Sequence, residues 1–438
     1  MNQLKFPLPE GFCTGHGRAD MSPQVPVMMG GGWNAEEVRD PLYATCTAIS
    51  DGENVVLLFH MDMKDMPRPI FLNASAKIFE KTGVPQENVI LNATHTHNCP
   101  HTSSMKDPAA VAWRERVAEA AAEAAEMALK DLAPSTISIA YGDTYRLNFV
   151  RRYLMPDGKY KMNASSKMNP VAHETEADPE FRLIRFHRDG KKDIVLVNWQ
   201  CHCATSQGYF RYSVSADIVE IMRLRVEKDA DVHFAYHNGH SANINTLDAL
   251  GNKLHKLHLD MADEMANRIL KALENTEPVQ SGKIHIDTLT MMQPVRQDSE
   301  ERRKGALEWA RAEADDRPAV LEKYGFDSMY EAIAINTRAN MEPISELHVT
   351  ALSFGDIGVT TMPFEAFDQN GMQIRAASPC KMTFTLAYTN GALGYMPAEE
   401  IFPHGGYEVY VSRFERGTAE KCVKELLRML NEQKNSTK

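Results

Sequence analysis

Residues 89–97 read Val89-Ile90-Leu91-Asn92-Ala93-Thr94-His95-Thr96-His97, a short apolar run that ends in two histidines. A run of this kind predicts a buried strand over 89–94. In an extended segment His95 and His97 project to the same side, because side chains alternate across a strand with a period of two. Two imidazoles then reach one pocket. The pair alone fits a chemical site and a purely structural role equally well.

The pattern around this run occurs three times along the chain. Each copy is predicted to contain a strand, a turn, a second strand, a helix and a third strand. The first copy covers 44–49, 55–60, 74–81 and 89–94, with its turn at 51–52. The second covers 181–186, 194–199, 216–227 and 232–236, with its turn at 189–190. The third covers 347–353, 358–362, 365–377 and 382–388, with its turn at 355–356. Chance is the alternative explanation, since such strings are common in mixed proteins.

This pattern predicts a mixed α/β (α+β) fold of layered mixed β-sheets flanked by helices, built from repeated strand-strand-helix-strand units. Residues 109–129 and 299–340 read as outer helices, and no linker divides the chain. We therefore expect one domain over 1–438, with a helical excursion near 299–340. Open α/β sheets place their sites beyond the carboxyl ends of strands, and the polar clusters of this sequence fall there.

Composition excludes some classes of partner. The 438 residues are 43% hydrophobic and carry a formal net charge of -11, without the basic stripe that nucleic acid requires. The sequence contains no run of about 18 apolar residues without a charge, so integral membrane association is not expected. Seven cysteines, an odd number, favour reduced thiols in the cytoplasm. A signal peptide removed beforehand would leave the same pattern in a secreted or periplasmic protein, and the sequence does not fix the oligomeric state.

Two more candidate residues follow predicted strands. His202 closes the apolar run 194–201, where a buried imidazole needs a partner. Glu365 follows Thr360-Thr361-Met362-Pro363-Phe364 and is predicted to open a helix, where the positive end of the dipole favours a carboxylate. An ordinary first-turn glutamate is the alternative.

Together these motifs closely resemble the neutral, non-lysosomal ceramidases. The resemblance rests on the Ala-Thr-His-Thr-His signature at 93–97, on an amino-terminal segment and on later motifs in the same order. They are Gly15-His16-Gly17-Arg18-Ala19-Asp20-Met21-Ser22-Pro23, Met28-Met29-Gly30, Trp199-Gln200-Cys201-His202, Pro363-Phe364-Glu365 and Thr389-Asn390-Gly391-Ala392-Leu393-Gly394-Tyr395. The resemblance spans residues 12 to about 415 and implies the fold of the neutral ceramidase catalytic domain.

Carried over residue by residue, the resemblance implies a zinc ion bound by His95, His202, Glu365 and Tyr395. It places His97 at the reacting carbonyl and Arg152, the second arginine of Val150-Arg151-Arg152-Tyr153, in the pocket. Tyr407, in a glycine-flanked turn, is a further residue that lines the pocket or packs beside it. Two imidazoles, a carboxylate and a phenolic oxygen suit Zn²⁺, which lowers the pKa of a bound water toward about 7.

The sequence also departs from the family. Where ceramidases have an Asn-Leu-Ser-Pro-like stretch, this chain reads Asn243-Ile244-Asn245-Thr246, so Asn245 stands at the serine position. An amide cannot serve as a nucleophile, which disfavours a covalent serine route and leaves attack by zinc-activated water. The carboxyl-terminal immunoglobulin-like domain of ceramidases is also not expected before the end at Lys438. Both departures favour an amide that is shorter or more polar than ceramide.

The sequence thus predicts a zinc-dependent hydrolase that cleaves a linear amide bond in a small N-acyl substrate. Two alternatives remain open. The first is a metal-binding, non-catalytic relative, suggested by Asn245. The second is a zinc-dependent esterase, because zinc-activated water is not intrinsically selective for amides.

Overall fold

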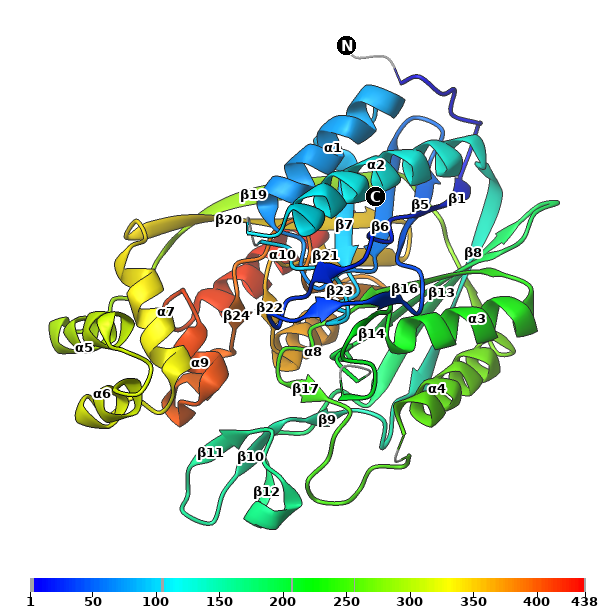
Figure 1. Cartoon of the computed structure of the whole chain (residues 1–438). Helices are drawn as coiled ribbons and strands as arrows, with labels where there is room; N and C mark the ends of the chain where they lie inside the picture. Colours follow the sequence, from blue (N-terminus) through cyan, green and yellow to red (C-terminus); the bar gives the residue numbers. More distant parts are fainter. Residues whose placement is uncertain (1–3, 104–105, 206–207, 256, 437–438) are drawn as a thin grey trace.

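The computed structural model describes residues 4–103, 106–205, 208–255 and 257–436. Within these residues one sheet of nine strands has the order β16-β14-β13-β8-β1-β5-β6-β7, and β18 pairs with β8 beside this path (Figure 1). Its strands are β1 (Cys13–Asp20), β5 (Tyr43–Ser50), β6 (Val55–Met61), β7 (Val89–Ala93), β8 (Ala133–Asp143), β13 (Glu180–Arg188), β14 (Ile194–Trp199), β16 (His233–Asn238) and β18 (Glu277–Val279). A second sheet contains β19 (Ile284–Pro294), β20 (Ile344–Phe354), β21 (Ile357–Thr361) and β23 (Met382–Leu386).

The three predicted copies share one topology. In the first, β5 is antiparallel to β6, and β7 returns parallel to β6 after α1 (Arg68–Thr82). In the second, β13, β14 and β16 repeat this arrangement around α3 (Ile218–Ala230). In the third, β20, β21 and β23 repeat it around α8 (Asp368–Ala377). Each hairpin turns at a glycine with positive φ: 90° at Gly52, 67° at Gly190 and 67° at Gly355. The repeated pattern read from the sequence is therefore confirmed.

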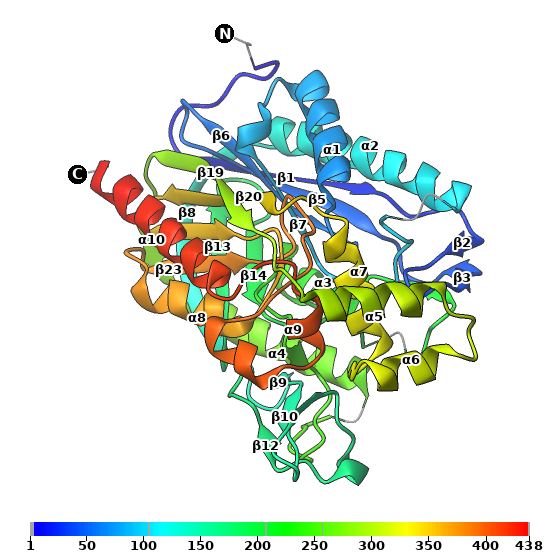
Figure 2. The ribbon, with the colours of Figure 1, turned by 90° about the vertical axis from the view of Figure 1, so that its left-hand side faces the viewer.

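Helices cover the outer faces of the sheets in pairs, as Figure 2 shows. α1 and α2 (Pro108–Lys130) pack together, and α2 lies on β1 and β5. α3 packs with α4 (His258–Leu273) against the second copy, and α8 packs with α10 (Thr418–Ser436) against the third. The sheets are thus layered between helices, as predicted.

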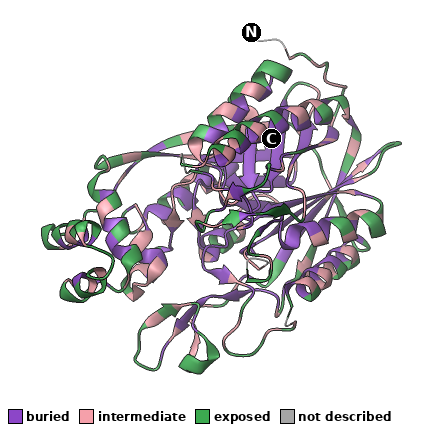
Figure 3. Cartoon of the chain, in the orientation of Figure 1, coloured by how far each residue is buried: buried purple, intermediate pink, exposed green. Residues whose placement is uncertain are grey.

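The inner faces of the three copies meet in one shared core. Leu58, Leu196 and Phe384 belong to the same buried cluster, although they come from three different copies. Their strand neighbours point the other way: Leu57 packs in the cluster beneath α1 and α2, and Val197 in the cluster beneath α3 and α4. Figure 3 shows that buried positions concentrate at the centre of the molecule. The alternation sets which side chains at the strand ends face the centre.

The close approach of α2 to β1 explains the Gly15-His16-Gly17 motif. A Cβ built on Gly15 would lie 2.0 Å from the carbonyl oxygen of Ala128, and one on Gly17 would lie 2.1 Å from that of Ala124. No side chain fits at either position. The two glycines and the alanines of α2 therefore let helix and sheet backbones touch.

Residues 299–340 contain the helices α5 (Glu300–Arg311), α6 (Arg317–Lys323) and α7 (Met329–Ala339), as expected. They pack around Trp309 and Ile335 in a small core of their own and stand out from the rest of the chain (Figure 1). α7 also packs on α9 (Tyr407–Val411), which links this excursion to the centre of the molecule. No helix in the described ranges has the length and apolarity needed to cross a membrane.

Short strands complete the structure. They are β2 (Val27–Met28), β3 (Asn34–Ala35), β4 (Glu37–Val38), β9 (Phe149–Val150), β10 (Arg152–Leu154), β11 (Tyr160–Met162), β12 (Ala172–His173), β15 (Ser213–Val214), β17 (Ile244–Asn245), β22 (Glu365–Ala366) and β24 (Tyr395–Met396). Two pairs matter for the site: β17 with β9, and β22 with β24.

Candidate metal centre

Three of the four predicted metal ligands lie beyond the carboxyl ends of parallel strands. His95 follows β7, His202 follows β14 and Glu365 follows β21. The second and third strands of each copy run parallel, so their carboxyl ends point the same way. Tyr395 joins the group because β22 pairs in parallel with β24, with Glu365 directly opposite Tyr395.

The rings of His95 and His202 face each other through their Nε2 atoms. His95 Nδ1 lies 2.8 Å from the Lys64 carbonyl oxygen, and His202 Nδ1 lies 3.4 Å from that of Ser241. A carbonyl only accepts, so these contacts assign the proton of each neutral ring to Nδ1 and the lone pair to Nε2. Burial lowers the pKa of both imidazoles well below its ordinary value, which keeps them neutral. The two Nε2 lone pairs are nevertheless only 3.2 Å apart.

Glu365 places a carboxylate oxygen beside His95. Its Oε2 lies 3.7 Å from His95 Nε2 and is buried without a hydrogen-bond donor from the described residues. Burial raises the pKa of the carboxyl to about 7, which the nearby Lys64 ammonium opposes. A hydrogen bond from Tyr395 also opposes the rise. An unpartnered oxygen beside a pair of nitrogens whose lone pairs face each other is an arrangement that a cation satisfies.

These donors fit zinc. With Zn–N bonds of 2.0–2.1 Å in tetrahedral geometry, two ligating nitrogens stand about 3.3–3.4 Å apart, close to the 3.2 Å between His95 and His202. The carbonyls of Lys64 and Ser241 orient the two rings, as outer partners of metal-bound histidines do. His97 Nε2 also lies 3.2 Å from His95 Nε2, and the three histidines have ligand atoms within 4.8 Å of one another.

The backbone that brings His95 and His97 together differs from the predicted one. β7 ends at Ala93, and His95 has a φ of 65°, in the left-handed region. Strand alternation therefore does not continue to His97, and that part of the reasoning was wrong. The rings still meet, with centroids 4.8 Å apart, because the turn folds them toward one another. Left-handed non-glycine residues cost energy and cluster at functional sites.

Tyr388 holds the turned histidine in place. It follows β23, also has a positive φ of 53°, and stacks on the His95 ring at 4.0 Å. Its hydroxyl lies 3.1 Å from Ser241 Oγ, beside the carbonyl that contacts His202. One aromatic side chain thus supports both imidazoles.

Glu365 does not open a helix, contrary to expectation. α8 begins at Asp368, and Glu365 belongs to β22, where its N–H donates to the Gly394 carbonyl at 2.9 Å. Pairing with β24 therefore takes the place of a first helical turn. The carboxylate is set by this strand pair, and the helix dipole does not account for its position.

The two neighbouring arginines have different roles. Arg151 Nη2 donates to the Tyr395 hydroxyl at 3.2 Å. Arg152, the predicted pocket arginine, instead forms ion pairs with Glu174 at 2.6 Å and Glu408 at 2.8 Å, and both of its partners are buried. Glu408 reaches both guanidiniums, since its other oxygen accepts from Arg151 at 3.0 Å. Arg151, which the sequence analysis passed over, is the arginine that contacts a predicted ligand.

Tyr407 and Asn245 lie in different surroundings. The Tyr407 ring packs edge-on against Tyr395, with centroids 5.4 Å apart, and burial raises the pKa of its hydroxyl. Asn245 Oδ1 accepts from the N–H groups of Thr246 and Leu247, and its Nδ2 donates to Asn163 at 3.1 Å. Tyr407 is thus beside the candidate centre, whereas the Asn245 side chain closes its own turn.

Comparison with known proteins identifies the fold. No protein-family model and no curated protein matches the chain. A ceramidase solved in complex with C2 superposes with a TM-score of 0.71 and 16% identity, covering 98% of this chain and 76% of its own. A neutral ceramidase from Pseudomonas aeruginosa gives 0.71 and 15%, covering 98% and 75%. The chain has the neutral ceramidase fold.

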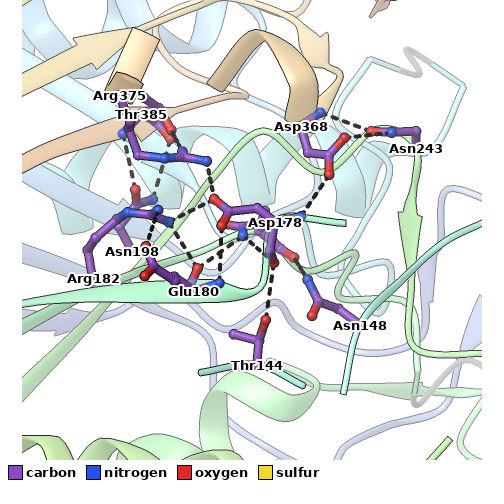
Figure 4. A network of polar contacts seen from close by, with 11 residues as sticks. Thr144, Asn148, Asp178, Glu180, Arg182, Asn198, Asn243, Asp368, Arg375 and Thr385 are labelled. Atoms are coloured by element: carbon purple, nitrogen blue, oxygen red, sulfur yellow. Dashed lines mark hydrogen bonds and ion pairs between the residues drawn. The ribbon is translucent and has the colours of Figure 1, made fainter. Parts of the chain in front are cut away.

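In this ceramidase-like fold a network of polar contacts gathers around Asp178 (Figure 4). Asp178 is paired with Arg182 at 2.8 Å and with Arg375, and its N–H donates to Asp368. Asp368 and Asn243 hydrogen-bond to each other twice, at 2.7 and 3.0 Å. The network joins α8 to the segment just after Ser241, so it fixes the carbonyl that orients His202.

A small cavity opens beside Glu365. Its volume is about 190 Å³. Its lining residues come mainly from the segments that follow β21 and β23. They are Asp65, Ser103, Phe364, Glu365, Tyr388, Gly391, Ala392, Gly394 and Arg413. Drug-sized ligand pockets measure roughly 300–1,000 Å³. The cavity therefore admits a small chemical group.

Sequence reasoning missed Arg151, Tyr388 and Arg413 at this site. The sequence did contain a signal that could have identified Arg151, because adjacent arginines on one extended segment face opposite ways and only one can reach the pocket. Tyr388 also had one, because it follows the last strand of the third copy, as His95 follows that of the first. Arg413 had none, since it follows no strand of a repeated copy.

Proposed function

We propose that this protein is a zinc-dependent hydrolase that cleaves the amide bond of a linear N-acyl compound by attack of a zinc-activated water. The observation that carries the proposal is the pair of facing Nε2 atoms of His95 and His202, 3.2 Å apart, with the unpartnered Glu365 Oε2 3.7 Å from His95 Nε2. The ceramidase-like fold supports amide hydrolysis as the reaction class.

We assign zinc to His95, His202, Glu365 and Tyr395. Bound zinc supplies a Lewis acid and a water of lowered pKa. Arg151 supports the Tyr395 oxygen with a hydrogen bond of 3.2 Å, which favours the anionic form that a ligating phenol adopts. Glu408 holds Arg151 in that position at 3.0 Å.

The remaining residues orient the substrate. We assign His97 to the carbonyl oxygen, where an Nε2–H donor stabilises the negative charge that develops in the transition state. Arg151 takes the pocket position first expected for Arg152. Arg152 acts through Glu408, which it shares with Arg151. Tyr407 packs against Tyr395 and sets the angle of that ring.

The cavity supports a short substrate. The cavity beside Glu365 measures about 190 Å³, below the roughly 300–1,000 Å³ of pockets for drug-sized ligands. Asn245, whose side chain closes its own turn, has no hydroxyl to attack a carbonyl. Attack by an activated water fits both features.

The placement of Asn245 also favours the second candidate, a metal-binding relative without catalysis. One experiment separates the candidates: zinc-loaded protein is incubated with short N-acyl amides and their ester analogues, with and without a chelator. We expect amide cleavage that the chelator abolishes and added zinc restores. Stoichiometric zinc without cleavage of any bond would support the non-catalytic relative, and cleavage of esters alone would support an esterase.

A further inference from the structure

The Arg413 side chain lies at the candidate site, and no described residue pairs with its guanidinium. It lines the same cavity as Glu365. A Cβ built on Gly394 would lie 3.8 Å from Arg413 Nε, so the side chain packs on the residue whose carbonyl accepts from the Glu365 N–H. Arg413 therefore packs on Gly394, the residue just before β24, and β22 and β24 carry two of the proposed ligands.

Its guanidinium makes no hydrogen bond or ion pair with any residue that the structure describes. Burial lowers the pKa of Arg413, and no neighbouring carboxylate opposes this effect. A guanidinium has five N–H donors, and a partly buried charge without a partner is costly. Arg151 and Arg152 in the same region are both paired with carboxylates. The unpaired state of Arg413 is thus a local exception.

Hydrogen bonds hold the backbone around Arg413 in place, although its guanidinium has no partner among the described residues. The Arg296 N–H donates to the Arg413 carbonyl at 2.8 Å. Arg338 of α7 donates to the carbonyls of Tyr410 and Ser412 at 2.7 and 3.0 Å, and is itself paired with Asp298 at 2.8 Å. The helical excursion therefore fixes the loop that presents Arg413, which lowers the entropic cost of binding a ligand there.

The charges around the cavity leave Arg413 available for an anion. Asp65 lies on the cavity wall, and its carboxylate is 3.8 Å from the Lys64 ammonium. Glu365 faces His95 and the proposed metal position. Each acidic group thus has a cationic partner of its own once zinc is bound, and Arg413 is the remaining positive charge.

We propose that Arg413 binds a carboxylate of the substrate, and that the preferred substrates are therefore short N-acyl compounds with a free carboxylate, such as N-acyl amino acids or monoamides of dicarboxylic acids. The inference rests on the proposed amide hydrolysis and names its substrate class. A guanidinium and a carboxylate match in charge and in their planar, two-pronged geometry. The small cavity limits how far the carboxylate can stand from the amide.

The test uses zinc-loaded, full-length protein and matched pairs of compounds, for example glutaramate and glutaramide, which differ only in the charged group. Binding is measured by calorimetry and hydrolysis by initial rates. We expect the carboxylate to be preferred by about 10- to 100-fold in both measurements, the range for a hydrogen bond to a charged group. Arg413→Met should reduce the preference about 10-fold or more, and Arg413→Lys should retain part of it.

Arg416→Met is the matched control. Arg416 lies on the same loop, is exposed and pairs with Glu399 at 3.3 Å, so its loss should leave the preference unchanged. If Arg413→Met weakened the charged and neutral compounds equally, its role would be structural and the inference would be overturned.

The two proposals fail in different ways. Carboxylate binding that depends on Arg413, without turnover of any compound, would support the anion subsite and refute the hydrolysis. Hydrolysis of neutral amides, with no preference for the carboxylate in binding or rate, would support the hydrolysis and overturn the subsite.

Discussion

His97 offers a sharp test of the proposed ligand set, because it is as close to His95 as His202 is. Both Nε2 atoms lie 3.2 Å from His95 Nε2. Geometry alone therefore allows a site of three histidines. We assign His202 to the metal and His97 to the substrate oxygen, so His97→Ala and His202→Ala should have different effects on zinc binding.

The size of the difference follows from linkage. Zinc at 100 times its dissociation constant stabilises a folded protein by about 2.7 kcal/mol. A chain of 438 residues has an unfolding entropy of roughly 0.9 kcal/mol/K. Zinc should therefore raise the Tm by about 3 °C in the wild type and in His97→Ala. His202→Ala should lose this shift, because His95 Nε2 then has no second histidine opposite it in the proposed ligand set.

Differential scanning calorimetry with and without zinc measures the shift, and initial rates report the chemistry. His97→Ala should lower kcat by about 10²- to 10³-fold, the cost of removing one donor to a developing oxyanion. If His97→Ala lost the zinc-induced shift as fully as His202→Ala, then His97 would be a ligand and the assignment would be refuted.

Two further predictions concern the fold. Gly15→Ala should destabilise the protein by about 1–3 kcal/mol or more in urea unfolding, because the new Cβ would lie 2.0 Å from the Ala128 carbonyl oxygen. Gly30→Ala is the control and should be nearly neutral, because the space around Gly30 is open. Burial lowers the pKa of His237 to about 3, so as the pH falls from 7 to 5 the unfolded chain binds a proton that the folded one does not, and stability falls by about 2 kcal/mol. His237→Gln should remove this loss of stability between pH 7 and 5, and His187→Gln, at a partly exposed position, should not. Equal pH profiles of stability for wild type and His237→Gln would contradict the role given to His237.

The repeated topology could be predicted because it depends on local signals. Glycines such as Gly52 and Gly190 mark the hairpins, and short continuous apolar runs mark strands that face a core on each side. Strand ends then indicate where polar side chains gather. His95, His202 and Glu365 could be placed near one another for this reason.

The details of the site depend on backbone turns and long-range contacts that no local pattern reveals. The left-handed φ of His95 replaces the strand that the sequence predicted. Glu365 pairs with Tyr395, which is 30 residues later in the chain, instead of starting a helix. Arg413 is presented by a loop that Arg338 fixes from another part of the sequence. These features arise from tertiary packing and needed the structure.

We propose that one zinc ion is held by His95, His202, Glu365 and Tyr395. Diffraction data collected on both sides of the zinc absorption edge, from crystals of the zinc-loaded protein, would locate the ion. We expect one anomalous peak within about 2.0–2.2 Å of a ligand atom from each of these four residues, with His97 outside the coordination sphere. A peak coordinated by His97, or the absence of any peak between His95 and His202, would contradict it.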